Sequence, residues 1–208
     1  MNEKFIQLAA FGAGEIEHLD GPFIDHLLGT MNLLKSWSAS EVLQNAGLYH
    51  AAYGTAGFDE KLTTLERRQE IAKIIGEKSE AIVYLYCACD RDYVWPQIGV
   101  VSNVEFKNRF TNQISPIKEQ ELRDFCDLTV ANELEIATDN PAFIEKNGEH
   151  FYETFERMQP YLSPPAIHAY KAILGSRWKD ISLSTEWKQA GVIKLRLSPA
   201  KEWEKSTT

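Results

Sequence analysis

Apolar residues recur along most of this chain at the three- and four-residue spacing of an amphipathic helix. In residues 23–37 the stripe is clear, since Phe23, Leu27, Met31 and Leu34 fall on one helical face. The same spacing predicts further helices over residues 38–50, 63–76, 79–87, 116–137, 141–158 and 164–174. Ser38 and Glu41 have the spacing of a capping box and mark the start of the helix predicted at 38–50. Prolines mark the starts of the last three predicted helices.

Residues 98–115 depart from this helical pattern. Alternating β-branched and aromatic residues predict a small β-hairpin there, and residues 192–197 form another candidate strand. The predicted fold is therefore all-α, a helical bundle with a small β-hairpin insertion.

Composition and charge narrow the classes of ligand. The chain has 208 residues, 44% of them apolar, which is enough to bury a core without a metal or a disulfide. Its 22 basic and 30 acidic residues give a net charge of −8, which argues against nucleic acid as the main ligand but leaves room for a small basic pocket. The sequence lacks a run of about 18 apolar residues, so a membrane span is not expected.

The cysteines and the N-terminal segment bear on the compartment. Three cysteines, Cys87, Cys89 and Cys126, make an odd number, and the first residues do not have the pattern of a signal peptide. Both features indicate a reduced, cytoplasmic protein. Cys87 and Cys89 could be soft metal ligands, but without a second such pair we predict that they are buried in a helix.

Two histidines lie on apolar helix faces. His26 shares its face with Leu27, and His50 shares its face with Leu43. Two adjacent helices would then each direct an imidazole into the interior, where its neutral nitrogen can bind a divalent cation. His18 could turn inward from a loop as a third nitrogen ligand. The alternative is that each imidazole is buried and hydrogen-bonded to a carbonyl or carboxylate group.

The segments that carry these histidines resemble the HD-domain superfamily of metal-dependent enzymes. Residues 46–55, AGLYHAAYGT, are similar to the helix bearing the His-Asp pair, and His26, in DHLLGT, lies at a separation typical of stringent-response alarmone hydrolases. Residues 124–133 resemble the helix that supplies the last carboxylate. The two motifs together also resemble a little-characterised HD-like family. The resemblance covers residues 18–137 and implies an HD-like bundle.

A metal site follows from the resemblance. It implies a divalent ion, of zinc, manganese, iron or nickel, at His26 and His50, and His18 could supply the third nitrogen of a single-metal site. Asp127 would be a further ligand or a catalytic residue, and Glu133 is the other catalytic carboxylate to consider.

The chain also departs from the family pattern. Ala51 stands where the aspartate of the His-Asp pair is expected, and Gly54 and Thr55 replace the acidic pair of the hydrolases. These changes leave a single-metal site or none. Tyr53 and Thr55 are predicted to contact the substrate at the end of this helix, and Arg68 is predicted to bind a substrate anion.

Three functions stay open at this point. The first is a metal-dependent hydrolase acting on a phosphorylated or nucleotide-like small molecule, and the second is a histidine-rich metal-dependent oxygenase. The third is a degenerate HD-like domain that binds a small molecule or a protein. The expected partner is a small-molecule substrate rather than nucleic acid or a membrane. Residues 1–137 are predicted to form the HD-like core, and residues 138–208 a C-terminal helical extension packed on it.

Overall fold

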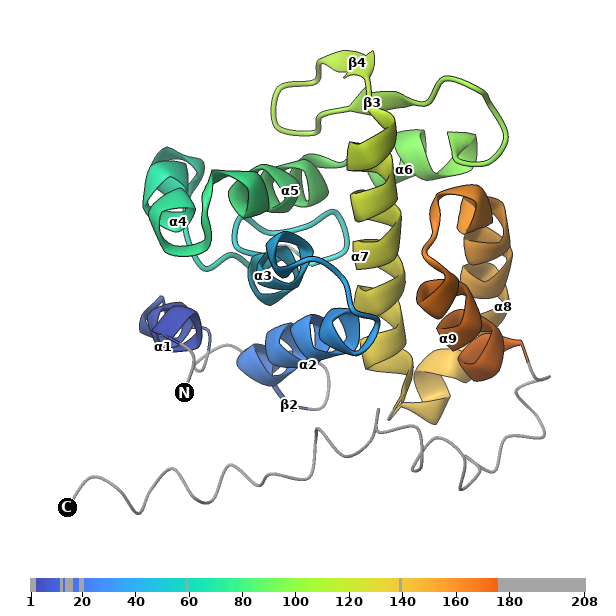
Figure 1. Cartoon of the computed structure of the whole chain (residues 1–208), viewed down its shortest axis with the longest axis horizontal. Helices are drawn as coiled ribbons and strands as arrows, with labels where there is room; N and C mark the ends of the chain where they lie inside the picture. The colour runs from blue at the N-terminus through green and yellow to red at the C-terminus, as the bar shows by residue number, and fades with distance from the viewer. Residues whose placement is uncertain are drawn as a thin grey trace.

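The structure is a computed structural model, and it describes residues 3–11, 13, 17–18, 21–58, 60–138 and 140–175 (Figure 1). Over these residues the fold is all-α with short β-pairings, as predicted. Its α-helices are α1 (Glu3–Ala10), α2 (Phe23–Ser36), α3 (Glu41–Tyr49), α4 (Arg68–Ile75), α5 (Glu77–Ala88), α6 (Arg91–Val94), α7 (Glu119–Thr138), α8 (Pro141–Met158) and α9 (Pro164–Leu174). Short 3-10 turns occur at η1 (Leu65–Arg67), η2 (Trp95–Gln97) and η3 (Gln159–Tyr161).

Side-chain caps fix where some of these helices begin. Ser40 caps α3, because its hydroxyl accepts a hydrogen bond of 3.2 Å from the backbone N–H of Leu43. The capping box predicted at Ser38 is therefore wrong: Ser38 lies in the left-handed region, with φ of 58°, in the turn between α2 and α3. Asn140 caps α8 in the same way as Ser40 caps α3.

Helix α7 occupies the centre of the molecule (Figure 1). It packs against α2, α3 and α5 on one side and against α8 and α9 on the other. Its side chains Phe125, Leu128 and Leu134 are buried in a hydrophobic cluster that extends from Leu8 of α1 to Leu174 of α9. Helices α8 and α9 thus share this core, whereas residues 176–208, with the candidate strand at 192–197, lie outside the described residues.

The predicted hairpin is present but begins later than its pattern suggested. Strands β3 (Glu105–Lys107) and β4 (Ile114–Pro116) pair antiparallel. Residues 98–104 contain turns rather than a strand, and Gly99 adopts a φ of 75° there. A second, unpredicted pairing joins β1 (Glu17–His18) to β2 (Gly21–Pro22), just before α2.

Two helical glycines allow the close helix contacts that shape the interior. A β-carbon on Gly29 of α2 would lie 2.8 Å from Cδ of Glu135 on α7. A β-carbon on Gly47 of α3 would lie 2.6 Å from Cδ1 of Leu34 on α2. Glycine costs about 1 kcal/mol in a helix interior, but here its small size brings α2 against both α3 and α7. In the described part of the chain, none of the helices has the length and apolar character needed to span a membrane.

Candidate functional site

His26 and His50 meet in the interior of the bundle, as the sequence predicted. His26 lies on α2 and His50 at the end of α3, and their side chains are 6% and 2% exposed. The ring centroids are 5.1 Å apart in an edge-on arrangement. The ring of Tyr86 on α5 also meets the His50 ring edge-on, at 5.7 Å between centroids.

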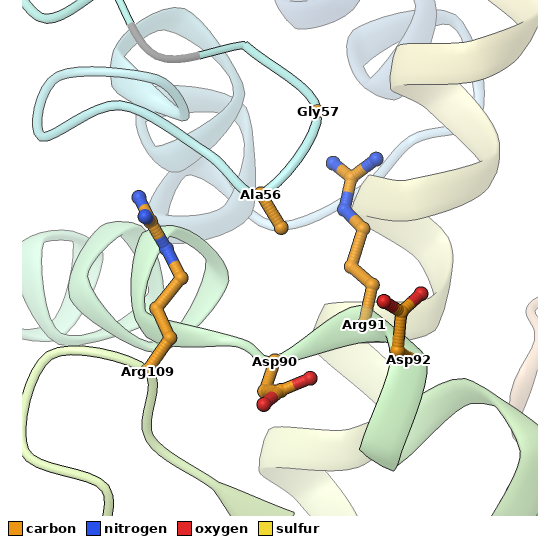
Figure 2. Close-up of a pocket in the computed structure, with 6 residues that line it drawn as sticks. All are labelled: Ala56, Gly57, Asp90, Arg91, Asp92 and Arg109. Carbon is orange, nitrogen blue, oxygen red and sulfur yellow. The ribbon is translucent and has the colours of Figure 1, made fainter.

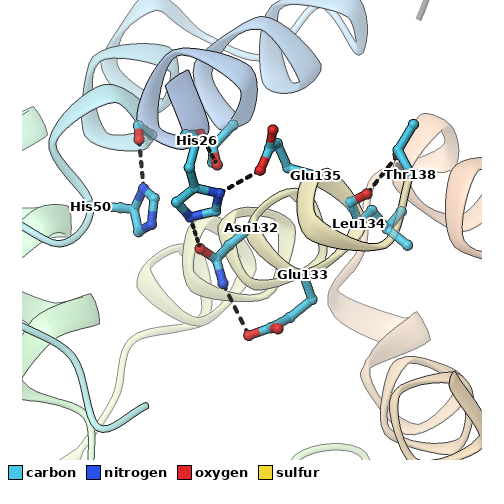
Figure 3. A network of polar contacts seen from close by, with 9 residues as sticks. His26, His50, Asn132, Glu133, Leu134, Glu135 and Thr138 are labelled. Carbon is cyan, nitrogen blue, oxygen red and sulfur yellow. Dashed lines mark hydrogen bonds and ion pairs between the residues drawn. The ribbon is translucent and has the colours of Figure 1, made fainter. Parts of the chain in front are cut away.

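Polar side chains of α7 surround the His26 ring (Figure 3). The Glu135 carboxylate contacts Nδ1 of His26, and the amide oxygen of Asn132 lies 3.0 Å from Nε2. The amide nitrogen of Asn132 in turn donates a 3.0 Å hydrogen bond to Oε1 of Glu133. These three α7 side chains are all buried, and the contacts satisfy part of their hydrogen-bonding capacity.

The orientation of the Asn132 amide identifies the hydrogen-bond donors on His26. Because the Asn132 nitrogen donates to a carboxylate, its oxygen faces His26, and an amide oxygen can only accept. Nε2 of His26 therefore donates to this oxygen, and Nδ1 contacts the Glu135 carboxylate.

The described residues bring the ring nitrogens of His26 and His50 and the carboxylate of Glu135 to this centre. Nδ1 of His50 donates a 2.7 Å hydrogen bond to the carbonyl oxygen of Gly47. Burial raises the pKa of the Cys87 thiol to about 12, so this neighbour stays a thiol and donates to the carbonyl oxygen of His50. Among the described residues, His, Cys, Asp and Glu side chains form no group of three that could hold a metal ion. The side chain of His18 lies outside the described part.

The carboxylate that meets His26 is Glu135, which corrects the prediction for Asp127. Asp127 lies on another face of α7, where Oδ1 accepts a 2.9 Å hydrogen bond from the backbone N–H of Ser163, at the start of α9. It therefore joins α7 to α9 and does not reach the histidines. Burial raises the pKa of the Asp127 carboxyl above its usual value.

Asp127→Asn is accordingly expected to retain stability at pH 7 rather than to abolish activity. The amide keeps an oxygen for the Ser163 N–H and removes a half-buried charge. Because the folded pKa is raised, the wild-type chain loses stability as pH rises from about 3.8, the ordinary value, through the folded pKa. The melting temperature of the variant should equal or exceed that of the wild type at pH 7, and this advantage should shrink toward pH 4. A loss above about 1 kcal/mol at pH 7 would show that the charge itself is needed beside α9.

The three residues predicted to contact substrate, Tyr53, Thr55 and Arg68, have partners other than the polar side chains of α7. Arg68 donates to both carboxylate oxygens of Glu80, at 2.6 and 2.9 Å, and the Tyr53 hydroxyl donates to the same carboxylate at 2.9 Å. The Arg68 guanidinium also stacks 3.6 Å from the centroid of Tyr84. Thr55 is buried, and its backbone pairs with Phe58. Tyr53 and Arg68 thus join the turn after α3 to α4 and α5 in a structural network.

A pocket of about 340 Å³ lies beside this polar centre. Two residues that follow Thr55 form part of its wall, and the other lining residues come from the start of α6 and from the segment after β3. The lining residues are Ala56, Gly57, Asp90, Arg91, Asp92 and Arg109. In Figure 2 the side chains of Arg91 and Arg109 extend in the same direction on either side of the Ala56–Gly57 turn.

The two arginines are held in different ways. Nη1 of Arg91 lies 3.3 Å from Oε1 of Glu133, and Nη2 lies 3.2 Å from the Tyr86 hydroxyl. Arg109 donates from Nε to the carbonyl oxygen of Cys87 at 2.7 Å, which leaves its two terminal nitrogens for other acceptors. Within the described ranges Arg109 makes no ion pair, whereas the lining residue Asp90 is paired with a lysine outside the pocket.

Sequence reasoning missed Glu135, Arg91 and Arg109. One signal for Glu135 was available: Asn132 and Glu135 are three residues apart on a helix whose surrounding positions are apolar, which is typical of a buried polar pair. The arginines had no such signal, because each belongs to a short segment without helical periodicity.

The comparisons with known proteins cover only part of this site. A family model described as a domain of unknown function (DUF6817) matches residues 7–91, which is less than half of the chain. The matched region includes both histidines and Arg91 but none of α7. Comparison with curated proteins and with solved structures finds no match. The match therefore groups the two histidine segments in one family region and carries no activity with it.

Proposed function

We propose that this chain is an HD-like domain that binds a small anionic molecule, of the phosphorylated class, in the pocket of Arg91 and Arg109. The observation that carries the proposal is the presence of two guanidinium groups on one cavity, one of them without a carboxylate partner in the described part of the chain. A guanidinium presents several N–H donors in a planar fork that matches the oxygens of phosphate or carboxylate.

The volume of the pocket and the net charge of the chain both support a small ligand. A volume of about 340 Å³ is at the lower end of the range for small-molecule pockets. The small side chains of Ala56 and Gly57 keep the space between the two guanidinium groups open. A net charge of −8 repels an extended polyanion, so the guanidinium of Arg109, which makes no ion pair within the described ranges, favours a compact anion that reaches it alone.

Arg109→Gln is expected to weaken binding of inorganic phosphate by about tenfold or more. The change removes one charged donor, and a hydrogen bond to a charged group contributes about 1.5–3 kcal/mol. Isothermal titration calorimetry at constant ionic strength measures the effect, with acetate as a second probe. Arg67→Gln is the matched control, because Arg67 is exposed and paired with Glu70 on α4, away from the pocket. Wild-type protein that binds neither probe, or equal affinity in both variants, would contradict the proposal.

Metal-dependent hydrolysis is a second candidate function. It is favoured by the side-by-side burial of His26 and His50, whose ring centroids are 5.1 Å apart, and by the Nδ1 of His50, which donates to a carbonyl oxygen as the second nitrogen of a metal-ligating histidine commonly does. A metal bound there would need His26 to give up one of its present hydrogen bonds. Protein freed of metal with a chelator should then melt at a higher temperature when zinc or manganese is added, because a ligand of the native state stabilises it.

A further inference from the structure

The charged residues that line the pocket differ in whether another side chain already balances their charge. Arg91 faces the carboxylate of Glu133, with Nη1 3.3 Å from Oε1. Its guanidinium also lies 5.5 Å from the ring centroid of Tyr86 and 5.0 Å from that of Trp95. Arg91 is therefore a firmly held cation with a counter-charge of its own.

Asp90 is balanced in a similar way. Nζ of Lys107 lies 2.7 Å from its Oδ2, and the backbone N–H of Tyr93 donates to Oδ1 at 3.2 Å. The hydrogen bond with Lys107 holds the pKa of the Asp90 carboxyl below its usual value. Both oxygens of Asp90 thus have partners outside the pocket.

Arg109 and Asp92 are the two lining residues whose charges have no such balance. Neutral groups hold Arg109: Nε donates to the carbonyl oxygen of Cys87 at 2.7 Å, and the guanidinium lies 4.6 Å from the ring centroid of Phe110. These contacts orient the side chain and leave its charge uncompensated. Asp92 is exposed, and its carboxylate makes no hydrogen bond or ion pair within the described residues.

These two residues lie toward opposite ends of the pocket lining. In the view of Figure 2, Ala56 and Arg91 lie between Arg109 and Asp92. The cavity thus has a free positive charge at one end and a free negative charge at the other. A ligand with negative charge alone would suit Arg109 but would face a like charge at Asp92, which is unfavourable.

We infer that this pocket binds a phosphomonoester that also carries an ammonium group, with the phosphate on Arg109 and the ammonium at Asp92. The inference rests on the anion-binding function proposed above and narrows its ligand class. Asp92 is then the specificity-determining residue, because only a ligand with a cationic end gains from its carboxylate. A volume of about 340 Å³ accommodates a short chain between the two charged groups.

Two probes of the same length test this assignment. 3-Aminopropyl phosphate and propyl phosphate differ by the ammonium group, and isothermal titration calorimetry at constant ionic strength gives both affinities. The wild-type protein should bind the aminopropyl compound about fivefold more tightly, the scale of an ion pair open to solvent. Asp92→Asn keeps the shape of the side chain and removes its charge, so it should bind the two probes equally and propyl phosphate no more weakly than the wild type does.

A matched control separates a local contact from the effect of the overall negative charge. Glu119→Gln removes one negative charge from an exposed carboxylate of α7 that is paired with Arg123 and lies outside the pocket lining. This variant should keep the fivefold preference for 3-aminopropyl phosphate. A preference lost in both variants would show that net charge, and not Asp92, selects the ligand.

The remaining outcomes distinguish this inference from the proposed function. If the wild type binds both probes equally, or if the preference survives in Asp92→Asn, the pocket binds phosphate and the ammonium assignment is wrong. If 3-hydroxypropyl phosphate binds the wild type as tightly as the aminopropyl compound, a hydroxyl is sufficient and the assignment is also wrong. If none of these probes and no inorganic phosphate binds, the proposed function fails and the inference fails with it.

Discussion

Glu135→Leu is expected to lower the free energy of unfolding by about 3–5 kcal/mol. The Glu135 carboxylate contacts His26 in the interior, and both side chains are at most 7% exposed. Removing the carboxylate takes away the oxygen that Nδ1 of the buried His26 contacts, and truncating one partner of a buried polar pair costs far more than the net contribution of the intact pair. Urea denaturation followed by circular dichroism measures the change, with the midpoint and the slope reported separately.

A double-mutant cycle provides the control for this result. His26→Leu combined with Glu135→Leu replaces both side chains with apolar ones and leaves neither polar group without the other. The double variant should recover much of the stability that the single change removes. If Glu135→Leu alone costs less than about 1 kcal/mol, the contact between His26 and Glu135 contributes little to stability.

Tyr86→Ala is the second change for which a large effect is expected, also about 3–5 kcal/mol of stability. Tyr86 is 1% exposed, and its ring packs against His50 at 5.7 Å and against Phe125 at 5.5 Å between centroids. Truncation leaves a cavity at the point where α5 faces α7, and it also removes the hydroxyl that faces Arg91.

Tyr86→Phe separates the two roles of this side chain. It keeps the ring and removes only the hydroxyl, so the expected loss of stability is about 0.5–1.5 kcal/mol. Thermal and urea unfolding of both variants give the comparison. A Phe variant as unstable as the Ala variant would show that the contact with Arg91, and not ring packing, dominates the contribution of Tyr86.

The helical architecture could be predicted from the sequence because each helix has its own local signal. The apolar stripe of Phe23, Leu27 and Leu34 requires burial on one face whatever the partner is, and it marks α2 within one or two residues. The burial of His26 and His50 follows from the same periodicity, since a residue on an apolar face goes inward with it. The hairpin, whose β3 and β4 are three residues each, had a weaker signal and a less accurate boundary.

The partner of His26 could not be chosen from the sequence, because the rotation of a buried helix about its axis is set by packing. At about 100° per residue, Asp127 and Glu135 lie about 80° apart around α7, and Asn132 lies about 60° from Glu135. Every face of α7 meets a neighbouring helix, so its apolar pattern does not mark a single inward direction. The close approach of α2 at Gly29 selects Glu135.

The pocket could be predicted from the sequence even less than the partner of His26, because it forms only in the tertiary structure. Its lining residues come from the turn at Ala56, from the residues around Arg91 and from Arg109, three segments whose local sequences carry no shared motif. The sequence by itself determined which segments form helices and which faces are buried, since both follow from local periodicity. Only packing decided which polar groups meet, because contacts between distant segments depend on the relative placement of whole helices.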